Sequence, residues 1–321
     1  MKEKIVILDG YTENPGDLSW EGFATFGEVQ VYDRTAPDQV VERIKDARIV
    51  LTNKTVISEK IMEKCSTLRY IGVLATGFNV VDISAAAKRN IVVTNIPGYG
   101  TDTVAQYTIA LLLELCHHVG AHSDSVKAGD WSRCSDFCYW KYPQIELENK
   151  VLGIIGYGRI GKKVAKLAVA FGMEVLVCSG HAVEATELTD KINQCSLEEL
   201  FTKADVISLH CPLTEKTRGL INRDTIAQMK DGVLIVNDSR GPLICQEDLR
   251  DALISKKVAG AALDVLDVEP PEKDNCLLDA PNLLITPHIA WATREARQRL
   301  MDMAVQNLEA FLTGTPVNVV S

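Results

Sequence analysis

The sequence predicts an α/β protein with two doubly wound parallel-sheet domains. Short apolar strands alternate with amphipathic helices along the chain, a pattern typical of parallel sheets that are covered by helices on both faces. The chain has 321 residues, whereas a single hydrophobic core stops growing at about 250–300 residues. We therefore expect two α/β domains rather than one.

The first part of the chain contains apolar, β-rich stretches with helical patterns between them. A long helix follows, and because residues 104–119 are apolar on nearly every side, we expect it to be buried. Residues 120–143 have no clear periodicity and carry Trp131, Phe137 and Trp140, which is typical of a contact surface. The predicted strands are 4–8, 48–52, 69–74 and 91–94, and the predicted helices are 37–47, 58–65 and 82–89.

A second alternation of strands and helices begins at Lys150. It ends in one long amphipathic helix over residues 292–312. The predicted strands are 151–155, 174–178, 206–209, 233–237, 260–263 and 283–286, and the other predicted helices are 162–171, 197–203, 224–229 and 246–254.

Composition and charge exclude several classes of function. The net charge of −9 opposes binding to nucleic acid, and no apolar run is long enough to span a membrane. Nine scattered cysteines indicate reduced thiols and a cytoplasmic protein. Cys134 and Cys138, with three histidines upstream, fit no standard zinc spacing, so we expect no metal.

A glycine-rich turn predicts a dinucleotide cofactor. Gly156, Gly158 and Gly161 form a G-x-G-x-x-G motif between an apolar strand and a helix, where main-chain N–H groups bind a pyrophosphate. In NAD-binding folds an acid commonly follows the next strand and binds the ribose hydroxyls. Here Ser179, Gly180 and His181 follow Cys178. We therefore expect NAD or NADP, with NADP at least accepted.

Three later segments carry a resemblance to a known family. They are residues 236–241 (VNDSRG), 262–270 (ALDVLDVEP) and 286–290 (TPHIA). With the glycine turn, they resemble the D-isomer-specific 2-hydroxyacid dehydrogenase family in order and spacing over essentially the whole chain. Within it, residues 97–102 and 131–142 look most like glycerate dehydrogenase and hydroxypyruvate or glyoxylate reductases.

The resemblance implies hydride transfer between NAD(P)H and the C2 carbonyl of a small 2-keto acid. Arg240 is expected to bind the substrate carboxylate with its planar charged group. His288 is expected to be the general acid and base, since histidine exchanges a proton near neutral pH. Glu269 is expected to hold the imidazole ring. These three are the predicted catalytic residues, and Arg240 and His288 are also expected to contact the substrate.

The resemblance also implies further binding residues. Main-chain N–H groups of Ala75, Thr76 and Gly77 are expected to bind the substrate carboxylate, with Lys54 nearby, although the family commonly has another glycine near Ala75. The expected cofactor-binding residues are Thr103, Gly156, Gly158, Arg159, Ile160, Gly161, Ser179, Gly180, His210, Cys211, Pro212, Thr217 and Asp264.

The same resemblance implies how the chain divides. A flavodoxin-like substrate-binding domain is expected from residues 1–98 and 289–321, with an NAD(P)-binding Rossmann domain, residues 99–288, inserted into it. A homodimer is expected, in which an aromatic near Trp140 reaches the partner subunit. Two alternatives remain open: an enzyme like phosphoglycerate dehydrogenase, and a non-enzymatic NAD-sensing protein like certain corepressors.

Overall fold

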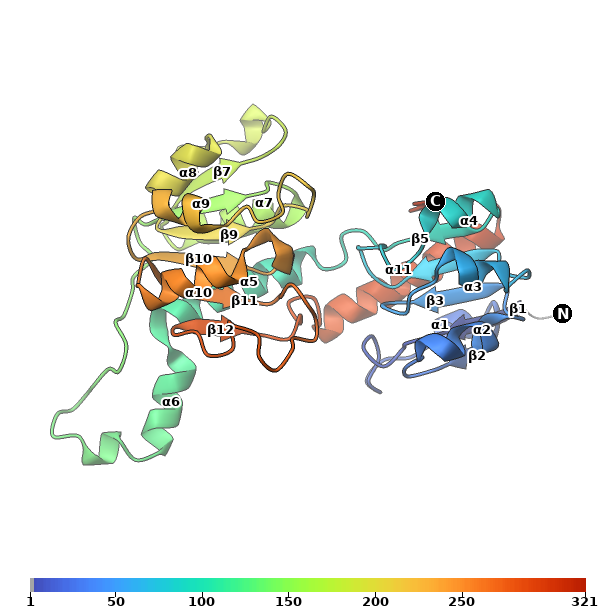
Figure 1. The fold of residues 1–321 in the computed structure, drawn as a ribbon, viewed down its shortest axis with the longest axis horizontal. Helices are drawn as coiled ribbons and strands as arrows, with labels where there is room; N and C mark the ends of the chain where they lie inside the picture. The colour runs from blue at the N-terminus through green and yellow to red at the C-terminus, as the bar shows by residue number, and fades with distance from the viewer. Residues whose placement is uncertain (1–2) are drawn as a thin grey trace. The chain divides into compact units, whose positions relative to one another are not determined.

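The computed structural model describes residues 3–321, which form two compact α/β units (Figure 1). The five-stranded unit comprises residues 3–100 and 291–321, and the seven-stranded unit comprises residues 101–290. All strand pairs of both sheets are parallel. The predicted fold class is confirmed. That one unit binds substrate and the other cofactor stays a prediction.

The sheet of the five-stranded unit has the order β2-β1-β3-β4-β5, which is the flavodoxin-like order. The order reverses between β1 and β3, so the loops after these two strands lie side by side at the carboxyl edge. The strands are β1 (Glu3–Ile7), β2 (Gly27–Val31), β3 (Ile49–Thr52), β4 (Tyr70–Val73) and β5 (Val92–Thr94).

The last helix, α11 (Arg294–Leu312), completes the core of the five-stranded unit. Its side chains Leu300 and Leu308 pack with Ile7, Leu51 and Tyr70 of the sheet. Thr293 caps the helix by accepting a hydrogen bond from the N–H of Ala296 at 3.3 Å. The other helices of this unit are α1 (Glu21–Ala24), η1 (Pro37–Gln39), α2 (Val40–Ile44), α3 (Glu59–Glu63) and α4 (Ile83–Lys88).

The sheet of the seven-stranded unit has the order β12-β11-β10-β9-β6-β7-β8. Strands β8-β7-β6-β9-β10-β11 reproduce the Rossmann order, and β12 extends it. Four of these strands coincide with the predicted ranges: β6 (Val151–Ile155), β7 (Glu174–Cys178), β9 (Val206–Leu209) and β10 (Val233–Asn237). The others are β8 (Ile192–Gln194), β11 (Val258–Leu263) and β12 (Leu283–Ile285).

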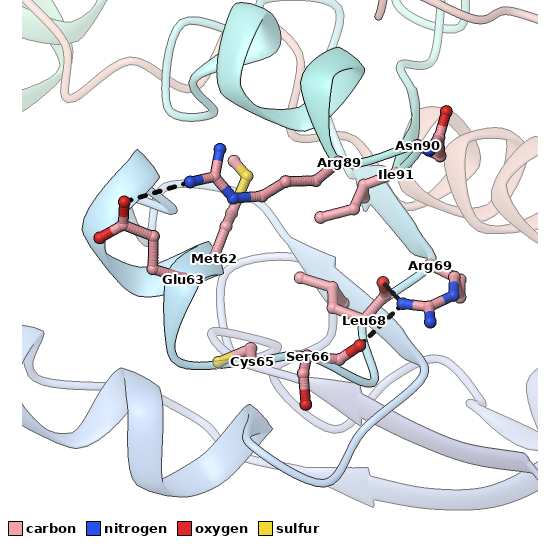
Figure 2. A pocket seen from close by; sticks show the side chains of 9 residues that line it. All are labelled: Met62, Glu63, Cys65, Ser66, Leu68, Arg69, Arg89, Asn90 and Ile91. Atoms are coloured by element: carbon pink, nitrogen blue, oxygen red, sulfur yellow. Dashed lines mark hydrogen bonds and ion pairs between the residues drawn. The ribbon is translucent and has the colours of Figure 1, made fainter.

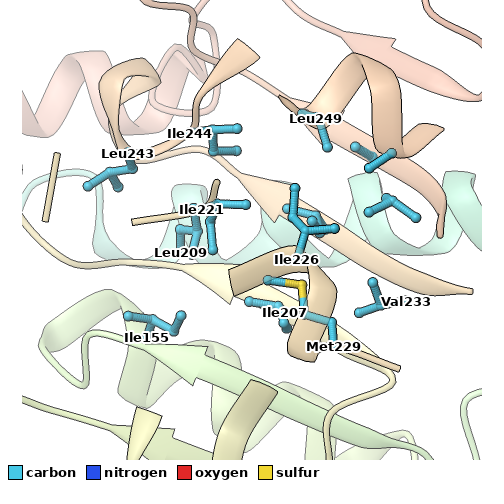
Figure 3. Packing of buried hydrophobic residues seen from close by; sticks show 14 of the residues in the cluster. Ile155, Ile207, Leu209, Ile221, Ile226, Met229, Val233, Leu243, Ile244 and Leu249 are labelled. Atoms are coloured by element: carbon cyan, nitrogen blue, oxygen red, sulfur yellow. The ribbon is translucent and has the colours of Figure 1, made fainter. Parts of the chain in front are cut away.

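Helices cover both faces of this sheet. One core cluster joins β6, β9 and β10 to α8, α9 and α10, with Ile207, Ile226 and Leu249 among its members (Figure 3). A second cluster joins the opposite face to α5 and α7, and successive residues of β10 alternate between the two. The helices are α5 (Thr101–His117), α7 (Arg159–Ala170), α8 (Leu197–Lys203), α9 (Arg223–Gln228) and α10 (Gln246–Ile254), with short helices η2 (Trp131–Arg133), η3 (Ala185–Glu187) and η4 (Gly241–Leu243).

Residues 119–127 form helix α6 (Val119–Lys127), in a segment whose sequence has no clear periodicity. His118, with φ of 48°, separates α6 from the buried helix α5. The helix and the following loop extend away from the rest of the seven-stranded unit (Figure 1). Within residues 3–321, no helix has the length and apolar character needed to cross a membrane.

Candidate active site

The three predicted catalytic residues follow three neighbouring strands of the seven-stranded unit. Arg240 follows β10, Glu269 lies in the loop after β11, and His288 follows β12. Because these strands are parallel neighbours, their carboxyl ends share one edge of the sheet. That edge is where open α/β sheets bind their ligands.

His288 and Glu269 form a close pair. His288 Nδ1 lies 2.6 Å from Glu269 Oε2, and Glu269 Oε1 accepts a hydrogen bond from the N–H of Leu266 at 2.9 Å. The carboxylate therefore ties the imidazole ring to the main chain of its own loop. The side chains of His288 and Glu269 are 31% and 36% exposed, so the pair is accessible to a small molecule.

The main chain at His288 is held in a conformation that non-glycine residues seldom adopt. Its φ is 55°, in the left-handed region. The buried carboxylate of Asp264 fixes this turn by accepting hydrogen bonds from Thr286 Oγ1 at 2.6 Å and from the N–H groups of Ile289 and Ala290 at 2.9 and 2.8 Å. Asp264 thus positions His288. Its predicted contact with the cofactor stays a prediction.

The loop of Arg240 lies against the loop of Glu269. A Cβ added at Gly241 would lie 2.0 Å from the carbonyl carbon and oxygen of Leu266, which leaves no room for a side chain. The guanidinium of Arg240 is exposed and donates from Nη1 to the carbonyl of Ser239 at 2.6 Å. An accessible, permanently charged fork therefore stands on the loop next to the His288–Glu269 pair.

The glycine turn has the shape that a pyrophosphate requires. Gly156 has φ of 101°, and an added Cβ would lie 2.4 Å from the main-chain nitrogen of Cys211. At Gly158, by contrast, an added Cβ would meet no heavy atom within 4 Å. Helix α7 begins directly after Gly158, so its first N–H groups lie beside this open space. Residues 156–161 therefore fit a dinucleotide.

The two glycines predict different effects when each is replaced by alanine. Gly158→Ala is expected to raise the Kd for NADH by about 5- to 150-fold, because the methyl group occupies space for the pyrophosphate at a cost of about 1–3 kcal/mol, while Tm is unchanged. Gly156→Ala is expected to lower the free energy of unfolding by about 2 kcal/mol, because of its φ and the contact with Cys211. Fluorescence titration and chemical denaturation measure the two effects. Wild-type NADH affinity in Gly158→Ala contradicts the assignment.

The side chain of His210 lies inside the seven-stranded unit. Its Nδ1 is 3.5 Å from Asp238 Oδ1 and its Nε2 is 2.8 Å from Ser208 Oγ, while Asp238 also accepts a hydrogen bond from Thr108. Burial lowers the pKa of His210 to about 4. Burial, aided by the charge of Asp264, raises the pKa of Asp238 to about 7. Any contact of His210 with a cofactor would therefore come from its main chain.

The sequence analysis does not identify Asp238, although an acid directly after a buried strand is a pattern that can indicate a functional side chain at a strand end.

Other predicted cofactor-binding residues make hydrogen bonds within their own loops. Thr217 Oγ1 donates to the carbonyl of Pro212 at 2.7 Å, and Thr103 Oγ1 to that of Ala290 at 3.4 Å. Ser179 Oγ accepts a hydrogen bond from the N–H of His181 at 3.2 Å. Their contacts with a cofactor remain predictions.

The predicted substrate residues of the five-stranded unit follow β3 and β4. The N–H of Lys54 donates to Asp9 Oδ2 at 2.6 Å. Thr76 Oγ1 donates to the carbonyl of Ile96 at 2.8 Å, and the N–H of Ile96 donates to the carbonyl of Ala75 at 2.9 Å. Both segments lie at the carboxyl edge of the sheet, and their binding role stays a prediction.

A pocket of the five-stranded unit lies at the opposite, amino edge of the sheet (Figure 2). It is lined by residues that precede β4 and β5, among them Arg69 and Arg89, and by none of the predicted site residues. Arg89 is already paired with Glu59 at 3.3 Å and with Glu63 at 3.2 Å. This pocket is therefore separate from the candidate site.

Comparison with known proteins identifies the family. Residues 109–290 match the model of the D-isomer specific 2-hydroxyacid dehydrogenase, NAD binding domain. The chain belongs to the D-isomer specific 2-hydroxyacid dehydrogenase family. This dehydrogenase is therefore a nicotinamide-dependent oxidoreductase that acts on a CH–OH group, as its motifs predicted.

The similarity extends over the full length of several relatives. The dehydrogenase is 54% identical to hydroxypyruvate reductase of Blautia hydrogenotrophica, over 99% of both chains. It is 38% identical to glycerate dehydrogenase of Methylorubrum extorquens, over 100% of this chain and 99% of the relative. Among solved structures, the TT0316 protein of Thermus thermophilus superposes with a TM-score of 0.84 at 33% identity, over 99% of this chain and 100% of that one.

Proposed function

We propose that this dehydrogenase reduces hydroxypyruvate or glyoxylate with NAD(P)H, to D-glycerate or glycolate. The observation that carries the proposal is the 2.6 Å pair of His288 and Glu269 beside the Arg240 loop. Reduction of a 2-keto acid needs a cation for the carboxylate and an acid for the developing alkoxide, and these loops offer both. The reductase relative at 54% identity supports the choice of substrate.

Arg240 binds the substrate carboxylate in this proposal. Its exposed guanidinium can donate two parallel hydrogen bonds to a carboxylate. Main-chain N–H groups of residues 75–77, with Lys54, supply further donors for the same anion. The net charge of −9 disfavours anions at long range, so these local donors must provide the attraction.

His288 transfers the proton. Glu269 holds Nδ1, so Nε2 is the nitrogen that gives a proton to the substrate oxygen in reduction and takes it back in oxidation. The carboxylate also stabilises the positive charge on the ring while the proton is held. Thr103, His210–Pro212, Thr217 and the glycine turn hold the cofactor, and the nicotinamide, when bound, supplies the hydride.

A substrate panel tests the proposal. Loss of NADH absorbance is measured with hydroxypyruvate, glyoxylate, pyruvate and phosphohydroxypyruvate. We expect the highest kcat/KM with hydroxypyruvate or glyoxylate. A preference for the phosphorylated acid supports the alternative like phosphoglycerate dehydrogenase, and no turnover with any 2-keto acid supports the NAD-sensing alternative.

We propose that NADPH is accepted as well as NADH. Ser179 stands where an acid usually repels the 2′-phosphate, and an added Cβ at Gly180 would meet no heavy atom within 4 Å. Like charges brought together cost several kcal/mol, and this cost is absent here. The expected kcat/KM for NADPH is within about a hundredfold of that for NADH. A larger preference for NADH in the same panel contradicts this proposal.

A homodimer through the segment of α6 and the following loop is also proposed. This segment exposes Phe137 and Trp140, which are 89% and 69% accessible, together with Trp131. Exposed aromatic side chains of this density mark protein contacts, and sedimentation equilibrium tests whether the mass in solution is that of a dimer.

The nine free cysteines favour a reducing compartment such as the cytoplasm.

A further inference from the structure

A buried acid lies where the strand order of the five-stranded sheet reverses. Glu13 follows β1 and Asn53 follows β3, the two strands at the reversal. Ligands of doubly wound sheets bind outside the carboxyl ends of the strands at such a point. None of the proposed catalytic steps uses Glu13.

The loop of Glu13 is fixed from outside by the last helix. Arg297 of α11 donates from Nη1 to the main-chain carbonyl of Glu13 at 2.9 Å and forms two hydrogen bonds with Asp17 at 2.8 and 2.7 Å. The side chain of Glu13 contacts Asn53 inside the unit, and the residue is 0% exposed.

Asn53 connects Glu13 to Leu74, the residue that precedes the proposed substrate-binding residues 75–77. Its Nδ2 donates to Glu13 Oε1 and to the carbonyl of Leu74, the latter at 2.8 Å. Its N–H donates to Asp9 Oδ1 at 2.8 Å, and the next N–H groups, of Lys54 and Thr55, donate to Asp9 Oδ2. Leu74 directly precedes residues 75–77, so one amide connects both proposed substrate-binding segments.

Two buried oxygens of this contact lack hydrogen-bond partners. They are Glu13 Oε2 and Asn53 Oδ1, and both hydrogens on Asn53 Nδ2 are already donated. An ionised carboxylate would leave two unpaired acceptors buried, which is costly. A proton on Glu13 Oε2 turns one acceptor into a donor, and a carboxylic acid facing a primary amide can form two hydrogen bonds in a ring.

The charged groups around Glu13 shift its pKa in opposite directions. Burial raises the pKa of Glu13 to about 8, against the hydrogen bond from Asn53, which lowers it. Asp9, from the loop after β1, raises this pKa, whereas Lys54 after β3 and Arg297 of α11 lower it. The effect of burial on this pKa is larger than that of the two cations, so the pKa is raised.

We propose that Glu13 is a neutral carboxylic acid whose proton closes the pair with Asn53, and that this pair positions Lys54 and residues 75–77 for the substrate carboxylate. Glu13 is therefore a positioning residue, and the inference rests on the proposed reduction of a 2-keto acid. Loss of the proton breaks one hydrogen bond of the pair and adds a charge beside Asp9. Substrate binding then weakens at alkaline pH.

The kinetic test compares KM for hydroxypyruvate from pH 6.5 to 9.5 in wild type and Glu13→Gln. With a pKa of about 8, roughly one wild-type molecule in ten keeps the proton at pH 9, so KM rises about tenfold from pH 7 to pH 9. Glutamine stays neutral and keeps both hydrogen bonds. Its KM is therefore expected to equal that of wild type at pH 7 and to lack this rise, whereas Glu13→Ala raises KM at every pH.

Glu21→Gln is the matched control, because it removes an exposed glutamate of the same unit; its KM profile should follow wild type. Coincident profiles of wild type and Glu13→Gln, or a KM for Glu13→Gln as high as for Glu13→Ala at pH 7, would overturn the inference.

Thermal unfolding tests whether Glu13 is protonated in the folded protein, and this measurement does not require enzyme activity. A folded-state pKa above the unfolded value of about 4.5 means that wild-type stability falls relative to Glu13→Gln between about pH 4.5 and 8, with no further change above. A Tm difference that is constant over this range shows that Glu13 is not protonated. If wild type turns over no hydroxypyruvate, the proposed function fails, and this unfolding measurement decides the state of Glu13 alone.

Discussion

Replacement of His288 by asparagine is expected to lower kcat for hydroxypyruvate by about 10²- to 10⁴-fold, the usual contribution of a positioned acid–base group. This loss corresponds to about 3–5 kcal/mol of transition-state stabilisation. Asparagine is chosen because it tolerates the left-handed φ of 55° at this position. The turn held by Asp264 is then preserved, and only the proton transfer is lost.

Two measurements separate this chemical effect from a structural one. The Tm and the Kd for NADH of His288→Asn should match wild type, since the glycine turn is unchanged. Glu269→Gln should give an intermediate loss of kcat, because the single amide oxygen can accept from only one of its two partners, His288 Nδ1 or the N–H of Leu266, and the negative charge is gone. Retained turnover in His288→Asn rules out His288 as the acid.

Replacement of Arg240 by glutamine is expected to lower kcat/KM for hydroxypyruvate by about 30- to 5,000-fold. Truncation of one partner of a hydrogen-bonded charge pair costs about 2–5 kcal/mol, and the substrate carboxylate loses its planar cation. Stability should not change, because the guanidinium is exposed and donates to the carbonyl of Ser239, its neighbour in the chain. Steady-state kinetics and a denaturation curve measure both quantities.

Lysine at position 240 tests whether shape or charge matters. Arg240→Lys keeps the charge and loses the fork, so only part of kcat/KM should return. Arg223→Gln is the control for overall charge, since Arg223 lies exposed at the start of α9 and pairs with Asp248 and Asp251. Equal losses in Arg240→Gln and Arg223→Gln would show that a long-range charge effect, and not carboxylate binding, explains the result.

The sequence predicts central strands better than edge strands. β6, β7, β9 and β10 coincide with their apolar runs, because parallel strands covered on both faces are apolar throughout. The sequence does not predict the edge strands β2 and β8, because most of their side chains are exposed or half-buried and neither strand has a continuous apolar run. Helix α6 was missed because it extends away from the unit, so no buried stripe sets a period.

The candidate site is likewise predicted where the sequence carries a local pattern. Arg240, Glu269 and His288 were singled out because they stand in recognisable motifs at strand ends, and the contact of Glu269 with His288 is present in the structure. The buried acids Glu13 and Asp238 were missed. Their burial depends on residues distant in sequence, Asn53 and Arg297 for Glu13, Thr108 and His210 for Asp238. Contacts between residues so distant in the sequence produce no local sequence pattern, so the burial of these acids could not be predicted.

The return of α11 to the five-stranded unit has a consequence for biosynthesis. The ribosome makes β1 to β5 first, yet the helix that supplies Leu300, Met301 and Leu308 to their core is made last. Residues 101–290 contain every strand of their own sheet and are complete before that helix emerges. We therefore expect the seven-stranded unit to fold before the five-stranded unit, because one apolar face of the five-stranded sheet lacks Leu300, Met301 and Leu308 until α11 is made.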